Sequence, residues 1–165
     1  MRFSISILSS FVFSIAAGTA AAQLYTITEI EPLGGESSVA HAIAPHGQFV
    51  VGEAENADGW TEAFFWAGRT MGLGTLGGRY SAAHGVSDQG FIVGGSSSGP
   101  DELPHAFIAH VRGGMQALPE NPDAQDSVAY DVFPRSRTLD EAIVVGRMHL
   151  PATHSGQAVL WRGAA

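Results

Sequence analysis

The chain contains no cysteine and no lysine among its 165 residues. Without cysteine it has neither disulfide bonds nor thiolate chemistry, so in an oxidising compartment its stability depends on its core and its hydrogen bonds. Without lysine it can form no Schiff base with a carbonyl substrate and has no phosphate-binding P-loop. Both absences narrow the enzymatic chemistry that the chain can carry.

Positive charge is also scarce. Sixteen acidic residues outnumber eight arginines, which gives a formal net charge of −8 with histidine neutral. A surface this acidic repels the phosphate backbones of DNA and RNA. We therefore expect no nucleic-acid partner.

Long apolar runs are absent after the N-terminus, and the one at the N-terminus is interrupted by serines. Residues 1–22 have the pattern of a signal peptide, because Arg2 precedes the apolar residues 3–17 and Ala20, Ala21 and Ala22 form a small-residue cleavage site. A membrane anchor would need about 18 continuous apolar residues. We expect cleavage before Gln23, a secreted or periplasmic protein, and no membrane anchor.

Internal repetition is the strongest signal that the chain does carry. Residues 33–43 return 43 positions later as residues 76–86, with Leu-Gly-Gly, a serine and a histidine at matching places. An apolar run that ends in Val-Gly follows in each repeat, at residues 49–52, 91–94 and 143–146. Repetition at this period indicates a repeat architecture.

Each repeat contains short runs of strand-forming residues separated by Gly, Pro, Asn, Asp and Ser, a pattern typical of an all-β meander. The 21 glycines recur too often for a stable helix. The sequence therefore predicts a single all-β domain over residues 23–165. Its repeated four-stranded antiparallel units cover about residues 23–72, 73–117 and 118–165.

A four-stranded unit of this length has the size of a β-propeller blade, so the units are predicted to be propeller-like blades, three per chain. The last unit supplies only three strands, whereas residues 25–30 supply one strand ahead of the first unit. Three blades are too few for an ordinary closed ring. Two chains could close a six-bladed ring as a homodimer, with each leading strand completing the last blade of its partner. An open three-sheet prism and a compact barrel-like arrangement use the same strands.

The second repeat combines Leu-Gly-Thr-Leu-Gly-Gly at residues 73–78 with Ser-x-Ala, Val-Gly and then His105-Ala106-Phe107. This combination resembles the HAF family of bacterial extracellular repeat proteins, and the resemblance covers nearly all of the chain after residue 22. It implies secreted or surface-exposed proteins with a propeller-like fold and no established enzymatic activity. The chain departs from the pattern at Glu62 and Gln157, where histidine is typical, and its third unit lacks Leu-Gly-Gly.

Seven histidines raise the question of a metal site: His41, His46, His84, His105, His110, His149 and His154. Zinc needs three or four converging ligands, and no pair with ligand spacing recurs from unit to unit. His41 and His84 occupy matching places, and we expect each imidazole to link its strand to the backbone of the next unit. His105 is expected to hold a strand end. We predict no metal or cofactor.

The acidic residues permit two other functions. Residues 53–59 could offer calcium ligands, but the loop lacks the EF-hand pattern and we expect a solvated hairpin loop. Four carboxylates permit a glycosidase: Asp58, Glu62, Asp101 and Glu120. Residues 94–99 only superficially resemble the Gly-x-Ser-x-Gly elbow of serine hydrolases, and we expect them to form a flexible hairpin end. No catalytic residue is predicted.

Trp60 follows Gly59 in a predicted loop, where its ring could stack on a sugar or a protein surface. Trp66 and Trp161 close the third strands of their units and are expected in the core. The sequence therefore predicts an exported, non-catalytic β-repeat module that binds a protein or glycan. A structural, self-assembling repeat protein is the alternative, and a secreted hydrolase is a third interpretation.

Overall fold

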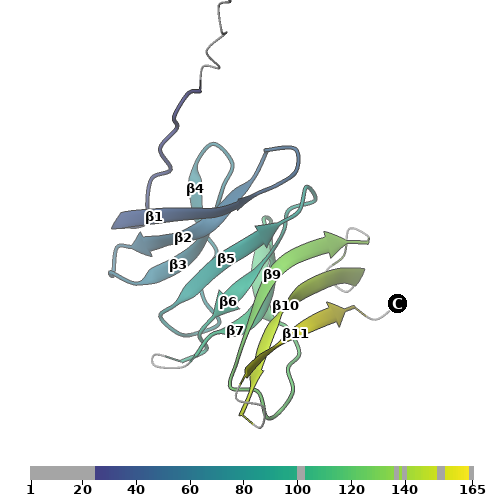
Figure 1. Ribbon diagram of the computed structural model, residues 1–165. Helices are drawn as coiled ribbons and strands as arrows, with labels where there is room; N and C mark the ends of the chain where they lie inside the picture. The colour runs from purple at the N-terminus through teal and green to yellow at the C-terminus, as the bar shows by residue number, and fades with distance from the viewer. Residues whose placement is uncertain (1–24, 100–102, 136–137, 139–140, 152–154, 164–165) are drawn as a thin grey trace, which may run out of the picture.

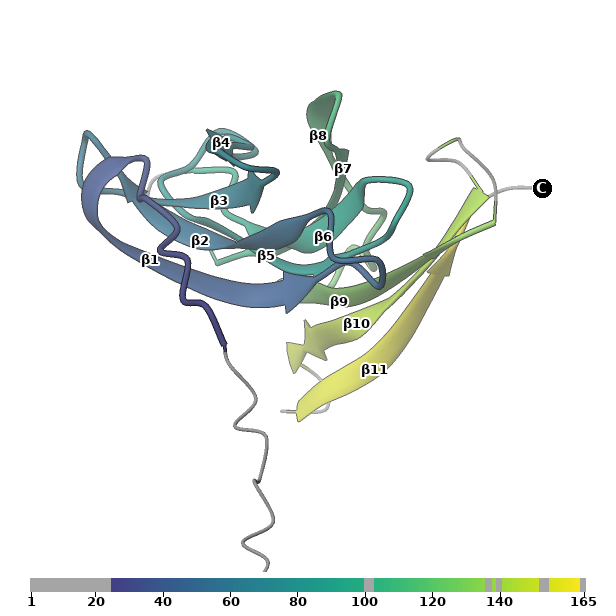
Figure 2. The ribbon, with the colours of Figure 1, turned by 90° about the horizontal axis from the view of Figure 1, so that it is seen from above.

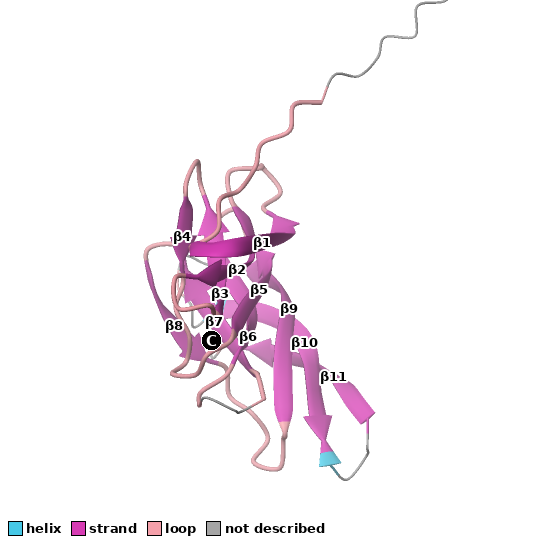
Figure 3. Ribbon diagram, turned by 90° about the vertical axis from the view of Figure 1, so that its left-hand side faces the viewer, coloured by secondary structure: helices cyan, strands magenta, loops and turns pink. Residues whose placement is uncertain are grey.

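The computed structural model describes residues 25–99, 103–135, 138, 141–151 and 155–163. Within these residues the chain forms eleven β-strands and no α-helix, arranged in three antiparallel sheets (Figures 1 and 3). The prediction of an all-β chain is therefore confirmed. The predicted signal peptide lies outside the described residues. Among the described residues there is no helix with the length and apolar character needed to span a bilayer.

Each sheet is formed by strands that follow one another in the chain. The first sheet has the order β1-β2-β3-β4 and contains β1 (Gly34–Ile43), β2 (Val50–Asn56), β3 (Thr61–Trp66) and β4 (Thr70–Gly72). The second has the order β5-β6-β7-β8 and contains β5 (Ser81–Val86), β6 (Phe91–Ser96), β7 (His105–His110) and β8 (Gly113–Ala117). The third has the order β11-β10-β9 and contains β9 (Asp126–Pro134), β10 (Ala142–Leu150) and β11 (Ser155–Arg162).

The leading strand predicted at residues 25–30 is absent from the single chain. Tyr25 and Ile27 are 82% and 89% exposed, and no residue of this segment is assigned to a strand. The segment leads away from the sheets (Figure 1). The open edge that it was expected to complete, β11, belongs to the third sheet, at the other end of the molecule from β1. The described residues therefore form eleven strands and not the twelve predicted.

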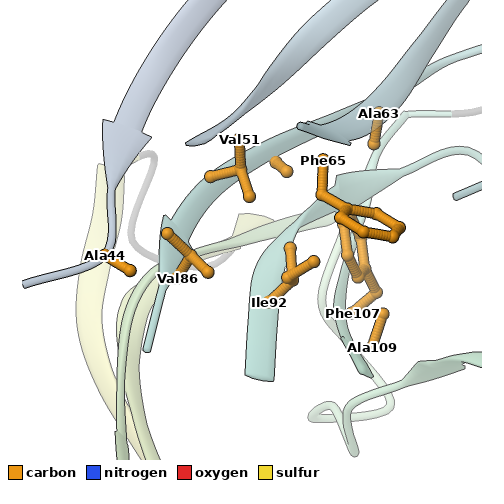
Figure 4. Packing of buried hydrophobic residues seen from close by; sticks show 9 residues of the cluster. Ala44, Val51, Ala63, Phe65, Val86, Ile92, Phe107 and Ala109 are labelled. Atoms are coloured by element: carbon orange, nitrogen blue, oxygen red, sulfur yellow. The ribbon is translucent and has the colours of Figure 1, made fainter. Parts of the chain in front are cut away.

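The three sheets pack against one another in a row (Figure 2). The first strand of each later sheet lies on the preceding sheet, because β5 contacts β2 and β3 while β9 contacts β6 and β7. Two apolar clusters fill the two interfaces. The first cluster includes Val51, Phe65, Val86, Ile92 and Phe107 (Figure 4), and the second includes Val93, Ile108, Ala129, Val132 and Val144. Burying each large apolar side chain stabilises the fold by about 1.5–3 kcal/mol.

The glycine that ends each Val-Gly run lies under the backbone of the first strand. A Cβ atom at this position would overlap a carbonyl oxygen of the first strand in every sheet, so no larger residue fits without moving the backbone. The three glycines are Gly52, Gly94 and Gly146. The most regular feature of the repeat is therefore a steric requirement of strand pairing.

A serine in the first strand of each later sheet links that sheet to the preceding one. The Ser81 hydroxyl accepts a hydrogen bond from the Ala63 amide at 2.8 Å and donates one to the Gly74 carbonyl at 2.7 Å. The Ser127 hydroxyl accepts from the Ala106 amide at 2.7 Å in the same way. These bonds satisfy backbone amides that β4 and β8 are too short to pair.

Candidate functional site

The first strand of each sheet carries a β-bulge at the same place in the repeat. His41, His84 and Tyr130 are the extra residues, because the residues on either side pair with the second strand and these three do not. A bulge redirects the side chain of its extra residue. The strands that carry them lie next to one another across the sheets, because β1 contacts β5 and β5 contacts β9 (Figure 2). We call these three residues the bulge row.

The rings of the bulge row contact one another in sequence. The Nδ1 atoms of His41 and His84 lie 3.0 Å apart, and the two ring centroids are 5.0 Å apart. The ring centroids of His84 and Tyr130 are 5.9 Å apart, with an interplanar angle of 57°. A hydrogen bond between two Nδ1 atoms requires one imidazole to donate and the other to accept. The row is therefore a fixed set of polar rings from three sheets.

Burial lowers the pKa of His84, and the positive charge that His41 can carry lowers it further. His84 therefore stays neutral near pH 7. The predicted link from each histidine to the backbone of the next unit is wrong, because the two imidazoles meet each other instead. Both residues lie at the β-bulge of neighbouring first strands, and their rings are in contact.

A carboxylate of the first sheet lies beside the bulge row. Glu53 of β2 places its Oε1 atom 3.8 Å from Nε2 of His41. Burial and then the negative charge of Glu53 raise the pKa of the Tyr80 phenol above its usual value. Tyr80 stays protonated and can donate a hydrogen bond at neutral pH.

In the third sheet, Arg147 of β10 contacts Tyr130, the last residue of the bulge row. Its Nε atom donates to the Tyr130 hydroxyl at 3.1 Å, and its Nη1 atom contacts Oδ1 of Asp126 at 2.6 Å. Asp126 is buried, and its Oδ2 atom lies 3.3 Å from Nδ1 of His149. The buried carboxylate therefore orients Arg147, which in turn orients the phenol of Tyr130.

An exposed aromatic group lies beside Glu53. Trp60 is 41% exposed and Tyr80 is 38% exposed, and the Arg79 guanidinium lies 4.9 Å from the centroid of the Trp60 ring. The Asn56 side chain accepts hydrogen bonds from the amides of Asp58 and Trp60, so the turn that carries the tryptophan is held in place. We call Trp60, Arg79 and Tyr80 the aromatic corner. Sequence reasoning identified Trp60 correctly as exposed.

Four other histidines make structural contacts. His46 binds Asp88 through its ring, at 2.5 Å, and its amide, and the amide bond is the main cause of the lowered pKa of Asp88. His105 binds Glu120 at 2.8 Å, which confirms that it holds a strand end. His110 accepts from the Arg112 amide and contacts the Gln89 carbonyl, and His149 contacts Asp126 as described above. His154 lies outside the described residues.

Two of the four carboxylates considered for catalysis, Glu62 and Glu120, form local structural hydrogen bonds. Glu62 accepts hydrogen bonds from the Gly74 amide at 2.9 Å and from Asn56 at 3.3 Å. Glu120 binds both His105 and the Ser127 hydroxyl. Asp58 lies in an exposed turn, and Asp101 lies outside the described residues. No group of three acidic residues or histidines in the described part of the chain is arranged to hold a metal ion.

Three local predictions need correction. Residues 53–56 belong to β2, so the acidic hairpin loop is shorter than predicted. Residues 94–96 belong to β6 and Ser97 is buried, so this part of the expected flexible hairpin end is in the core. Trp161 is only partly buried; it packs against the second cluster and donates to the Pro119 carbonyl at 2.7 Å. Trp66 is likewise only partly buried.

Sequence reasoning missed Tyr130 as a member of the bulge row, and it missed Arg147 and Asp126 as the residues that hold the Tyr130 phenol. The signal for Tyr130 was present, because it follows Ser127 at the spacing that separates His84 from Ser81. Arg147 follows the third Val-Gly directly, as Glu53 follows the first. The repeat positions of Tyr130 and Arg147 therefore indicate their roles, whereas their residue types do not.

No family model, curated protein or solved structure matches the chain. The resemblance to HAF repeats therefore rests on the sequence motifs alone and stays a prediction.

Proposed function

We propose that this protein is an exported, non-catalytic β-repeat module that binds a protein or glycan partner through the bulge row and the aromatic corner. The observation that carries the proposal is the alignment of His41, His84 and Tyr130, which come from three sheets and line up on first strands. A surface built on paired strands is rigid, so binding would cost little conformational entropy.

The chemistry of this surface favours a glycan. The exposed rings of Trp60 and Tyr80 offer flat apolar faces on which a sugar ring can stack. Beside them, Glu53, the imidazoles and the phenols supply hydrogen-bond donors and acceptors for sugar hydroxyls. Specific sites combine a few placed polar groups with apolar and aromatic surface in this way.

The charge of the chain narrows the ligand further. The formal net charge of −8 favours neutral or basic partners over acidic polysaccharides or nucleic acid. The proposed export agrees with the signal-peptide pattern of residues 1–22 and with a chain that contains no oxidisable thiol. The structural hydrogen bonds of Glu62 and Glu120 support a non-catalytic role for both carboxylates.

A panel of neutral, basic and acidic oligosaccharides tests the proposal, with binding to residues 23–165 followed by tryptophan fluorescence and calorimetry. We expect a neutral or basic glycan to bind, and the Trp60→Ala variant to bind at least tenfold more weakly, which corresponds to about 1.4 kcal/mol. Phe133→Ala removes an even more exposed aromatic ring that belongs to neither the bulge row nor the aromatic corner, and it should leave binding unchanged.

Either of two results would contradict this function, and a third would narrow it to a protein partner. If a glycan binds but neither Trp60→Ala nor Tyr130→Ala weakens it, the binding surface is elsewhere. If no glycan binds, the glycan class is wrong and a protein partner is the remaining form of the proposal. Turnover of any oligosaccharide in the panel would contradict the non-catalytic role.

A further inference from the structure

The row of three sheets ends in two faces that no described residue covers. At one end, β1 presents the face that β5 and β9 bury against the preceding sheet. At the other end, β10 and β11 present the face that the first and second sheets bury against the following one. Both end faces carry large exposed apolar side chains, including Val39, Ile43, Val145 and Leu160.

The repeat shows what normally covers the face of β1. Ile43 is 62% exposed, yet its equivalents Val86 and Val132 are only 6% and 7% exposed, because each packs against the preceding sheet. Val39 is 52% exposed, whereas its equivalents Ala82 and Val128 are buried, and Val128 lies against Gly95 of the preceding sheet. The exposed residues of β1 therefore occupy interface positions.

The face of the third sheet is exposed where the equivalent faces of the first two sheets are buried under the next sheet. Leu160 is 48% exposed, whereas its equivalents Phe65 and Ile108 are 8% and 5% exposed under the next sheet. Val145 is likewise exposed, although its equivalents in the first two sheets, Val51 and Val93, are completely buried. The two end faces thus match the two sides of the interface that the chain already forms twice.

Each end of the chain also carries one of the two residues that form the serine link between sheets. Ser81 and Ser127 accept hydrogen bonds from the amides of Ala63 and Ala106. By repeat position, Ser38 of β1 corresponds to these serines, and Ala158 of β11 corresponds to these alanines. Ser38 and Ala158 belong to opposite ends of one chain, so they can complete the link only between two chains.

The third sheet ends at β11, where the first two sheets each have a fourth strand. That fourth strand leads directly into the next sheet. Residues 25–30 lead into β1 in the same way, and Ser38 donates to the Ile30 carbonyl at 2.7 Å, much as Ser81 donates to the Gly74 carbonyl. This segment is therefore placed to serve as the fourth strand of a sheet that precedes β1.

We propose that a second copy of this chain docks head to tail, with the β1 face of one copy on the β10–β11 face of the other. Residues 25–30 of one copy then lie along β11 of its partner. The contact joins two different surfaces, so the two copies can satisfy both ends by closing into one ring of six sheets. Ring closure would also place the bulge rows of the two copies end to end.

Because the chain has no cysteine, engineered disulfides can test this contact directly. The Ser38→Cys and Ala158→Cys variants should each form no covalent dimer when oxidised alone but should form one when mixed, at least tenfold above either variant alone. The matched control is Ala63→Cys with Ser81→Cys in one chain, which places the same pair at an existing interface and should form a disulfide within that chain.

A second pair of variants distinguishes loss of the contact between copies from loss of folding. Leu160→Arg places a charge on the proposed interface and should reduce the cross-link at least tenfold, whereas Leu103→Arg, at an exposed residue outside it, should not. Circular dichroism checks that both variants fold. If the internal control forms its disulfide and the mixed variants do not link, the head-to-tail contact is wrong. A cross-link that Leu160→Arg leaves unchanged would overturn it equally.

Discussion

Single residues explain why the bulge row is sensitive to protonation. The Nδ1 contact between His41 and His84 holds at most one positive charge without repulsion, and burial already disfavours the charged form of His84. The contact therefore requires a neutral His84. At the other end of the row, the Tyr130 hydroxyl accepts a hydrogen bond from Arg147, which contacts Asp126, so the row joins a histidine pair at one end to a phenol and a guanidinium at the other.

This asymmetry gives a pH prediction. The folded protein binds a proton at His84 less readily than the unfolded chain does, so unfolding takes up a proton at low pH. The contribution to the free energy of unfolding is complete above the ordinary histidine pKa of about 6.5 and falls as the pH drops from there toward the lowered pKa of the folded state. Urea denaturation between pH 7.5 and 5 measures it.

The His84→Gln variant should show a smaller loss of stability over this pH range than the natural protein. His110→Gln is the matched control, because it removes a histidine whose ring is held by backbone groups and not by a second histidine. Equal pH dependence in the natural protein and in His84→Gln would show that His84 titrates normally in the folded state.

The sequence predicted which residues occupy equivalent repeat positions better than it predicted the contacts of their side chains. The sequence identified His41 and His84 as equivalent but suggested the wrong contact, because a β-bulge is not visible in a pattern of residue types. Tyr130 escaped notice because phenol replaces imidazole at that position. In the same way, Glu62 replaces the histidine of the repeat and still holds its strand end, by accepting from the Gly74 amide instead of binding a glutamate as His105 does.

At the scale of the elements, the bulge and the glycine of Val-Gly form one unit. The bulge brings a carbonyl oxygen of the first strand close to the second strand, and only glycine leaves room for it. This requirement explains why all three repeats retain Val-Gly although their loops and first strands diverge. It also explains why the strands were predictable from this signal.

The Gly94→Ala variant tests this unit. Its new Cβ would overlap the backbone of Ala82 at a fully buried site, so we expect a loss of about 1–3 kcal/mol or more in the free energy of unfolding. Gly156→Ala is the control, because the nearest atom lies 3.7 Å away on a flexible arginine side chain. Denaturation in urea would show equal effects of the two substitutions if the glycine were not required.

The strand predicted at residues 25–30 depends on a neighbouring strand that the sequence of one chain does not reveal. Residues 25–30 are rich in the β-branched and aromatic residues that favour strands, but a strand forms only where a neighbour supplies its backbone hydrogen bonds. Within one chain the open edge of β11 is out of reach. Residues 94–96 show the converse error, because glycines and serines that resemble a loop are buried in β6 when a neighbouring sheet covers them.

At the scale of the whole molecule, the fold follows from repetition. Each sheet uses the next one to cover its face, as in other repeat proteins in which neighbouring units supply the core. Such a row leaves one face open at each end, and exposed strand edges and apolar faces tend to pair. The proposed contact between two copies covers both faces with the packing that the chain already uses internally.

The most direct test of this account is the solution mass of residues 23–165, measured by light scattering over a range of concentrations. A closed head-to-tail pair predicts the mass of two chains, and removal of residues 25–30 should shift this toward the mass of one because the last sheet then loses its fourth strand. A single-chain mass at every concentration would contradict the account and would show that the two end faces stay uncovered.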